Sequence, residues 1–270
     1  MLSIRQAVCG YRRGTKQTVV IDGLDMEVGH GQIMCVLGKN GAGKTTLFRT
    51  VLGSLPLLGG SVEIDGVSLE SMTRSQIARR IAYVPQSHVP PFPFTVRQIV
   101  EMGRAAHMKI WNTPSEEDRI ASEQAIRRMG IMDLADRPYT EISGGERQLV
   151  LIARAIAQEA DYLIMDEPSA SLDFGNQVRV MELIRALAGK GHGIIMTTHY
   201  PDQVFMADSC CTVILDRQNF LTGRAEDVLT ADLMRELYGI EAAVLTSSSA
   251  AGQTVRSVAS YGTVQKIERA

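Results

Sequence analysis

Short apolar runs alternate along the chain with stretches of helical periodicity. An unbroken apolar run at residues 33–37 stands before a glycine-rich turn and predicts a buried strand. The apolar positions of residues 45–52 recur at helical spacing and stop at Gly53. Residues 62–66 alternate like a half-buried strand that ends in a turn. The pattern therefore predicts a strand, a helix and a second strand in this order.

The middle of the chain has a different pattern. Pro90, Pro91 and Pro93 predict a loop. Apolar residues then recur at helical spacing at Val96, Ile99, Val100 and Met102. Residues 120–129 show the same helical spacing. We expect a mainly helical insertion between about residues 87 and 156.

Strand patterns return at residues 162–165 and 193–196, with a helix predicted between them at about 177–188. Strands that alternate with helices imply a parallel sheet with both faces covered. The tail from Glu241 onward is rich in Ala, Ser, Thr and Gly. It predicts either a strand-turn-strand around residues 248–252 or a flexible end. The predicted fold class is α/β.

Composition and charge narrow the class of protein. The chain is 45% hydrophobic and 21% charged, with a net charge of −2, a balance typical of a soluble globular protein. A domain that coats nucleic acid usually has a strong basic excess, which is missing here. No segment has the roughly 18 uninterrupted apolar residues of a membrane span, and the N-terminus does not resemble a signal peptide. We expect the protein to be made and kept in the cytoplasm.

The four cysteines lack the paired spacing of a zinc site. Three of Cys9, Cys35, Cys210 and Cys211 lie in apolar, strand-like runs. We expect small buried side chains in a reducing compartment. The alternative is a metal or redox role for the pair Cys210 and Cys211.

A glycine-rich segment follows the first predicted strand and precedes the first predicted helix. It matches the pattern G-x-x-x-x-G-K-[ST] through Gly38, Lys39, Asn40, Gly41, Ala42, Gly43, Lys44 and Thr45. Glycines let backbone N–H groups wrap around phosphate oxygens, and the helix directs its positive end at the same anion. In such a loop Lys44 reaches the β- and γ-phosphates, and the Thr45 hydroxyl binds Mg²⁺. The alternative, a chance glycine-rich turn, does not account for the strand and helix on either side.

Two carboxylates, Asp166 and Glu167, follow the predicted strand at residues 162–165. Phosphoryl transfer needs charge neutralisation and a positioned water. Asp166 is therefore a candidate Mg²⁺ ligand and Glu167 a candidate catalytic base. Successive strand residues point to opposite faces, a restriction that is relaxed at the end of a strand. The alternative is a solvated acidic pair that caps the strand.

Four further segments stand in a fixed order around these two motifs: residues 83–86, 142–148, 168–173 and 197–199. Together with the phosphate loop and the pair Asp166 and Glu167, these four segments resemble the ATP-binding cassette of ABC transporters over residues 2–240. The resemblance implies an ATPase with a phosphate-loop core, a mixed and mainly parallel sheet, and an inserted α-helical subdomain. It divides the chain into an ATPase domain at 1–240 and a C-terminal extension at 241–270. Within that domain the core comprises 1–86 and 157–240, and the helical subdomain 87–156.

The resemblance also implies roles for single residues. Gln86 senses Mg²⁺ and the attacking water, and His199 bonds the γ-phosphate and supports Glu167 in orienting that water. Ser143 and Gly145 bind the γ-phosphate held by a second copy, and Asp173 helps to join the two copies. The implied ATP-binding residues are Tyr11, Gly38, Asn40, Gly41, Ala42, Gly43, Lys44, Thr45, Thr46, Ser143, Gly144, Gly145 and Asp173. The implied Mg²⁺ ligands are Thr45, Gln86 and Asp166. Tyr11 matches the aromatic that stacks on adenine, and the alternative is a tyrosine of the core.

The chain departs from the family's pattern at three places. Glu146 follows Ser-Gly-Gly where Gln is commoner, and residues 169–173 read Ser-Ala-Ser-Leu-Asp instead of Thr-Ser-Ala-Leu-Asp. Tyr200 follows His199 where Asp is commoner. None of these changes removes a catalytic group.

The partners follow from the resemblance as well. It implies a homodimer that closes on ATP, polytopic membrane permease subunits, and an extracytoplasmic substrate-binding protein, with no nucleic acid. The chain would lie at the cytoplasmic face of the inner membrane. Residues 95–104, 134–137, 229–230 and 233–240 resemble the branch that imports iron-siderophores, haem and cobalamin, and residues 103–107 and 199–203 favour its molybdate members. Phe92, Phe94 and Met102 either receive the permease or pack the helical subdomain.

Three other functions are open to a cassette. One is a soluble cassette ATPase that acts on ribosomes or DNA or assembles iron–sulfur clusters. Cassettes that act on ribosomes usually come as two in one chain, and those of DNA repair carry long coiled coils; this sequence has neither. A regulatory cassette that does not hydrolyse ATP should lack Glu167 or His199, and both are present. A cassette of an exporter with separate membrane subunits differs from an importer only by the branch resemblance.

Overall fold

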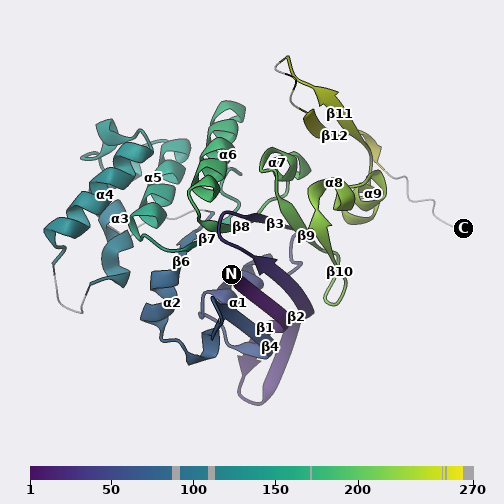
Figure 1. Ribbon diagram of the computed structural model, residues 1–270, viewed down its shortest axis with the longest axis horizontal. Coiled ribbons are helices and arrows are strands. Elements are labelled where there is room, and N and C mark those ends of the chain that lie inside the picture. The colour runs from purple at the N-terminus through teal and green to yellow at the C-terminus, as the bar shows by residue number, and fades with distance from the viewer. Residues whose placement is uncertain (87–91, 109–112, 171, 251, 253, 264–270) are drawn as a thin grey trace, which may run out of the picture.

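The computed structural model describes residues 1–86, 92–108, 113–170, 172–250, 252 and 254–263. A six-stranded sheet in the order β10-β9-β3-β8-β7-β6 lies at its centre (Figure 1). Its strands from β9 to β6 are parallel, and β10 pairs antiparallel with β9. The strands are β3 (Ile33–Gly38), β6 (Ile81–Val84), β7 (Tyr162–Asp166), β8 (Gly193–Thr197), β9 (Cys210–Ile214) and β10 (Phe220–Arg224). The predicted α/β fold with a mainly parallel sheet is confirmed.

A second, antiparallel sheet in the order β2-β1-β4-β5 has only one strand that the sequence pattern predicted, near residues 62–64. Its strands are β1 (Leu2–Arg13), β2 (Lys16–Val28), β4 (Leu57–Ile64) and β5 (Val67–Ser68). Strand β1 carries register shifts on both sides of Ala7, and Gln6 has a positive φ of 46°. These bulges interrupt the two-residue alternation by which a strand is recognised in a sequence.

The central sheet is buried on both faces. In β3, Met34 and Val36 belong to a core shared with the antiparallel sheet and helix α1 (Lys44–Val51). Cys35 and Leu37 belong to the core on the other face, which includes residues of α6 (Phe174–Gly189). A strand covered on both faces needs apolar side chains at every position, which explains the unbroken run at residues 33–37.

The described residues of the expected helical insertion form three packed helices and three short 3-10 turns, at the left of Figure 1. They are α3 (Val96–Glu101), α4 (Glu116–Arg128), α5 (Gly144–Ala157), η2 (Met102–Ala106), η3 (Met132–Leu134) and η4 (Tyr139–Glu141). Thr95, Ser115 and Ser143 begin the three helices as capping boxes, in which a hydroxyl and a side chain three residues later satisfy the free N–H groups. Local sequence therefore sets where each helix begins.

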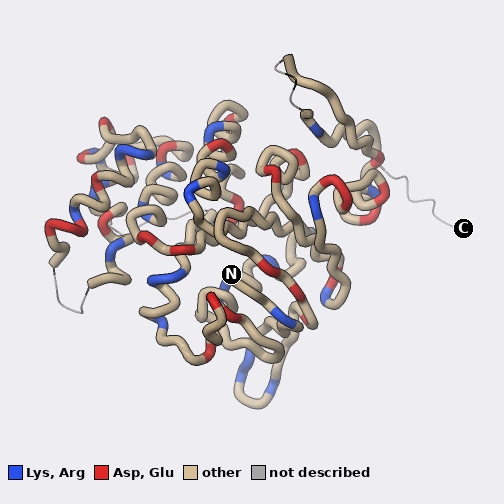
Figure 2. The backbone as a smooth tube through the Cα atoms, in the orientation of Figure 1, with Lys and Arg blue, Asp and Glu red and all other residues tan. Residues whose placement is uncertain are grey.

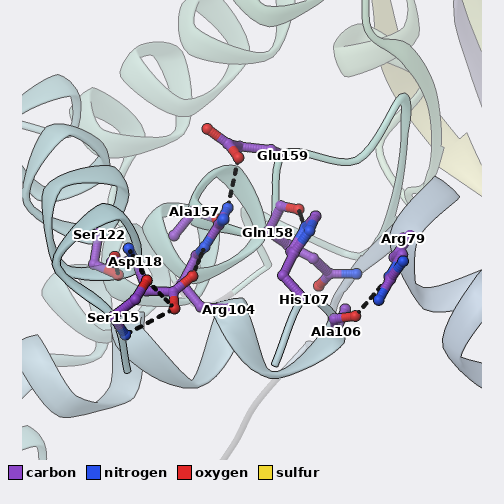
Figure 3. A network of polar contacts seen from close by, with 10 residues as sticks. All are labelled: Arg79, Arg104, Ala106, His107, Ser115, Asp118, Ser122, Ala157, Gln158 and Glu159. Atoms are coloured by element: carbon purple, nitrogen blue, oxygen red, sulfur yellow. Dashed lines mark hydrogen bonds and ion pairs between the residues drawn. The ribbon is translucent and has the colours of Figure 1, made fainter. Parts of the chain in front are cut away.

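A polar network fastens this helical region to the rest of the chain (Figure 3). Arg104 Nε donates to Asp118 Oδ1 over 2.9 Å, and Arg104 Nη1 donates to the Ala157 carbonyl over 2.8 Å. Nearby, Arg79 Nε of α2 (Arg74–Arg80) donates to the Ala106 carbonyl over 2.9 Å. The network thus joins η2 to the start of α4, to the end of α5 and to α2.

The last part of the chain forms a hairpin. Helices α8 (Ala225–Val228) and α9 (Ala231–Tyr238) lead into β11 (Ile240–Ser248) and β12 (Thr254–Thr263), which pair antiparallel. Of the two alternatives for this region, the structure has the strand-turn-strand. Strand β12 packs against α7 (Pro201–Met206). Figure 1 shows the hairpin at the upper right. The remaining short element is η1 (Leu69–Ser71).

Three of the four cysteines are buried, as expected: Cys9, Cys35 and Cys211. Cys210 is exposed. Within the described ranges no three His, Cys, Asp or Glu side chains are grouped as metal ligands. None of the helices in those ranges has both the length and the apolar character needed to cross a bilayer. Figure 2 shows acidic and basic residues interspersed along the helices and loops.

Candidate active site

The phosphate loop joins β3 to α1. Gly41 and Gly43 have φ values of 82° and 103°, a region that favours glycine. A Cβ atom added at Gly43 would lie 2.7 Å from Val20 Cγ1, so a side chain is excluded there by contact as well. Gly43 offers no side-chain cap to α1. The first N–H groups of this helix therefore stay available to an anion.

Lys44 lies at the base of this loop and is only 7% exposed. Its Nζ donates to the Gly38 carbonyl over 2.6 Å and to the Lys39 carbonyl over 3.3 Å. Burial lowers the Lys44 pKa, against the opposing effect of the carboxylates Glu167 and Asp166. The Lys44 ammonium group therefore interacts electrostatically with Asp166 and Glu167, the two acidic residues predicted for the site.

The two threonines of the loop differ in exposure. Thr45 is exposed, which leaves its hydroxyl accessible, and Thr46 is buried. The Thr46 hydroxyl lies 3.2 Å from the Tyr11 hydroxyl. Tyr11 is 40% exposed and so is not a core aromatic. Its role at adenine stays a prediction.

Asp166 and Glu167 are held by one hydroxyl group. Thr197 Oγ1 donates to Asp166 Oδ1 over 2.7 Å and accepts from the Glu167 backbone N–H over 2.9 Å. Glu167 has a φ of 49°, in the left-handed region that side chains seldom adopt. Because this turn ends the strand's alternation, two consecutive carboxylates can serve the same site.

The Glu167 carboxylate is fixed on both of its oxygens. Gln86 Nε2 donates to Oε2 over 2.9 Å, and His199 Nε2 is paired with Oε1. The Glu167 side chain is 12% exposed and that of His199 is 32% exposed. Gln86, Glu167 and His199 follow β6, β7 and β8, which are neighbours in the parallel sheet. The carboxyl ends of parallel strands form the usual ligand-binding edge of such a sheet.

Ser143 and the two following glycines stand at the N-terminus of α5. The Glu146 N–H donates to Ser143 Oγ over 3.3 Å, and the Ser143 N–H donates to Glu146 Oε2 over 2.7 Å. This bond from the Ser143 backbone lowers the Glu146 pKa. Glu and Gln both make a capping box, so the departure at residue 146 preserves the local structure. A Cβ atom at Gly144 would meet nothing within 4 Å, so this turn is open on its outer side.

Asp173 begins α6 and accepts a hydrogen bond of 2.9 Å from the Asn176 N–H. That backbone bond lowers the Asp173 pKa. An added Cβ at Gly145 would lie 3.5 Å from Asn176 Nδ2, so Asp173 and the glycines of α5 are near one another. Across the described ranges, no hydrogen bond or ion pair joins Ser143 or Asp173 to the phosphate loop or to Glu167. The predicted site residues therefore form two groups. The first surrounds the phosphate loop and Glu167, and the second lies at the beginnings of α5 and α6, around Ser143 and Asp173.

Two residues of the site were not predicted to act there. Thr197 is one, and the other is Tyr83, whose hydroxyl donates to Asp166 Oδ2 over 3.5 Å. Burial raises the Tyr83 pKa to about 12, so the hydroxyl keeps its proton. Each of them is a polar residue in an otherwise apolar strand, and both strands, β6 and β8, pair with β7. This polar position was the signal that the sequence offered.

The fold and the site together define a phosphate-loop nucleotide-binding protein. A glycine-rich loop and Lys44 stand between a buried strand and a helix, beside two carboxylates at the edge of a parallel sheet. A family model described as "ABC transporter" matches residues 21–170, more than half of the chain. The chain belongs to this family: it is an ATP-binding cassette and an ATPase.

Individual relatives agree with this assignment. An uncharacterised ABC transporter ATP-binding protein of Haemophilus influenzae is 42% identical over 88% of this chain and 89% of its own length. A cobalamin import ATP-binding protein of Halobacterium salinarum is 36% identical over 88% of this chain but only 60% of its own length. Other relatives are named for hemin, molybdate and siderophore transport. A solved structure described as an inward-facing, putative metal-chelate type ABC transporter is 30% identical, has a TM-score of 0.82, and matches 96% of this chain and 97% of its own.

Proposed function

We propose that this chain is the ATP-hydrolysing subunit of an importer that takes up a metal chelate or a metal oxyanion. One observation supports hydrolysis above all. Glu167 is held between Gln86 and His199, and its negative charge acts to raise the pKa of Lys44. A carboxylate with both oxygens fixed and little exposure suits a base that orients one water molecule against a phosphate.

Each group of the site has a task in this proposal. Lys44 exchanges the Gly38 carbonyl for the β- and γ-phosphates when ATP arrives. Glu167 takes a proton from the attacking water at its carboxylate, and His199 bonds the γ-phosphate and holds Glu167 in place. Oxygen ligands suit Mg²⁺, and Thr45, Gln86 and Asp166 offer a hydroxyl, an amide and a carboxylate. Bound there, Mg²⁺ would neutralise charge on the phosphates.

The second group, Ser143, Gly144, Gly145 and Asp173, serves the other copy of the chain. The open turn at Gly144 leaves the helix N-terminus of α5 accessible, which is the arrangement that binds an anion. ATP would therefore be held between the phosphate loop of one copy and α5 of the other. Loss of the γ-phosphate removes this bridge, and a homodimer reopens.

Membrane permease subunits would read out this motion, so that the chain works at the cytoplasmic face of the membrane. Phe92 is 63% exposed and Met102 is 40% exposed, so both are accessible to such a subunit, whereas Phe94 packs against the core. Pro90 and Pro91 lie outside the described residues. An extracytoplasmic substrate-binding protein would deliver the cargo to the permease. Relatives named for hemin, siderophore, cobalamin and molybdate transport support a metal-containing cargo.

The chain divides according to these tasks. Residues 1–86 and 157–240 form the catalytic core, residues 87–156 the helical subdomain that carries Ser143, and residues 241–270 an extension. A limited proteolytic digest that releases the helical region with its fold intact would support this division.

The proposal is tested with the Glu167→Gln variant, tagged and expressed in its native host. Gln keeps the shape of the side chain and cannot accept the proton, so ATP stays bound and the closed dimer accumulates. Membranes are extracted in mild detergent with ATP, and co-purifying proteins are identified by mass spectrometry. A polytopic membrane protein with a companion binding protein supports an importer. A polytopic membrane protein of exporter type, or soluble partners alone, overturns the importer proposal and leaves the ATPase assignment standing.

A further inference from the structure

Two of the last elements of the chain, α9 and β12, contact the segment that carries His199. The Val258 N–H of β12 donates to Asp202 Oδ1 over 2.7 Å. The Tyr238 hydroxyl, at the end of α9, lies 3.5 Å from the His199 carbonyl and donates to it. Burial raises the Tyr238 pKa to about 12, so this hydroxyl remains a donor at neutral pH. Both contacts join residues that are distant in the sequence.

The short segment at residues 198–203, which contains His199 and Asp202, has hydrogen bonds of its own. Tyr200 N–H donates to Thr198 Oγ1 over 3.0 Å, and Thr198 Oγ1 donates to Gln203 Oε1 over 2.7 Å. Thr198 is 2% exposed and Gln203 is 5% exposed. The first turn of α7 therefore fixes the backbone on both sides of His199. Any shift of α7 along its axis would move His199 relative to Glu167.

Strand β12 packs against α7. Val258 also packs against the core on the helical face of the central sheet. The bond of 2.7 Å from the Val258 N–H to Asp202 Oδ1 is a polar link between this hairpin and α7. It connects the start of α7 to an element that is itself anchored in the core.

We propose that Asp202 is a positioning residue for ATP hydrolysis. By accepting the Val258 N–H, it ties α7 to the C-terminal hairpin and so keeps His199 opposed to Glu167. The hairpin is then part of the machinery that sets the rate of hydrolysis. The inference rests on the proposed role of His199. It goes beyond that role because it assigns a catalytic consequence to the C-terminal extension.

The test compares three variants of the full chain in steady-state ATP hydrolysis. Asp202→Ala removes the acceptor, Asp202→Asn keeps an oxygen in the same place, and Asp232→Ala is a matched control. Asp232 also lies in the C-terminal part of the chain, but its side chain is 90% exposed and is paired with Arg235. A displaced catalytic group lowers turnover more than binding, so Asp202→Ala should lower kcat about tenfold with little change in KM for ATP.

Asp202→Asn should recover most of the lost rate, because its amide oxygen can accept the Val258 N–H. The Asp232→Ala rate should equal that of the unaltered chain. Rates are compared well below the thermal unfolding midpoint of each variant, so that partial unfolding does not contribute. The inference is overturned if Asp202→Ala matches the control, or if Asp202→Asn is as slow as Asp202→Ala.

A double-mutant cycle shows whether Asp202 acts through His199. Single-turnover hydrolysis of radiolabelled ATP, with enzyme in excess, measures slow rates in a His199→Ala background. If Asp202 works by placing His199, its replacement should have little further effect there, so the two losses are not additive. Additive losses would sink the inference while leaving the role of His199 intact. A His199→Ala chain that hydrolyses ATP at the unaltered rate would instead remove that role, and the inference with it.

Discussion

At the scale of single residues, the hydroxyl of Thr197 bonds to the carboxylate of Asp166 and to the backbone of Glu167. Its O–H donates a hydrogen bond to Asp166 Oδ1, and its oxygen accepts one from the Glu167 backbone N–H. Thr197 is fully buried, so neither bond competes with water. The side chain therefore holds the candidate metal ligand and the candidate base at a fixed separation.

Replacing Thr197 by Val tests this function of the hydroxyl. The isosteric change leaves the Asp166 carboxylate and the Glu167 N–H without their partner. It should lower the free energy of unfolding by about 1–3 kcal/mol, measured by urea denaturation. It should also lower kcat for ATP hydrolysis, because Asp166 and Glu167 lose their common anchor.

Thr212→Val is the control for this prediction. Thr212 is equally buried, in strand β9 of the same sheet, and its hydroxyl lies 3.0 Å from that of Thr222. Its loss should lower stability and leave kcat within about a factor of two, since no site residue depends on it. Equal effects of the two changes on kcat would contradict the role of Thr197.

The sequence predicted the residues whose chemistry is visible in a motif and missed this one. Lys44, Asp166, Glu167 and His199 belong to short patterns with a fixed order. Thr197 acts only because β7 and β8 pair in a register that places it opposite Asp166. Register depends on the packing of the whole sheet, so no local pattern contains it.

At the scale of elements, the bond between Arg104 and Asp118 holds the helical region together. Both residues are buried, at 7% and 8% exposure, and Asp118 also completes the capping box that Ser115 begins at α4. The hydrogen bond from Arg104 is the main cause that lowers the Asp118 pKa to about 2. A buried pair of this kind is costly to break, although Arg104 Nη1 keeps its bonds to Glu159 Oε2 and to the Ala157 carbonyl.

Asp118→Asn should therefore lower the free energy of unfolding by about 2–4 kcal/mol at neutral pH. The effect depends on pH, because the folded-state pKa lies below that of the unfolded chain. The stabilisation from the ionised carboxylate is complete above about pH 4 and is lost as the pH falls toward 2. Urea denaturation across this range should show the variant and the unaltered chain converging in acid.

Glu123→Gln on the same helix serves as the comparison. Glu123 pairs with Arg127 one turn away, at 2.8 Å, and both side chains are exposed. Exposed pairs of this spacing contribute little to stability because solvent screens them, so the change should be small. A loss as large as that of Asp118→Asn would mean that burial is not the source of the difference.

Elements with strict periodicity were predicted better than those with irregular backbones. The helix expected at about residues 177–188 is α6, and the strands expected near residues 33–37, 162–165 and 193–196 are β3, β7 and β8. The long strand β1 was missed because its bulges break the alternation. A bulge is stabilised by the partner strands, and those are far away in the sequence.

At the scale of the whole molecule, nucleotide binding should raise the stability of the fold. A ligand that binds only the folded chain adds about 2.7 kcal/mol when its concentration is 100 times its Kd. Lys44→Ala should remove most of this gain, because it removes the cation that meets the phosphates. The measurement is the thermal unfolding midpoint with and without Mg-ATP.

Lys16→Ala is the matched control, since Lys16 is an exposed lysine at the start of β2. It should leave the midpoint shift caused by ATP unchanged. An equal shift in Lys44→Ala would refute the assignment of the phosphate loop as the nucleotide site.

The distribution of the four thiols has a practical consequence. Burial raises the pKa of Cys9 to about 11 and of Cys35 and Cys211 to about 12, so these three offer almost no thiolate to a reagent at neutral pH. Cys210 alone among the four is exposed. A maleimide dye or a nitroxide spin label would thus attach at one position of the natural sequence, without any cysteine being removed. In a homodimer the two labels would form a single pair, whose separation reports how the copies approach and part during a cycle.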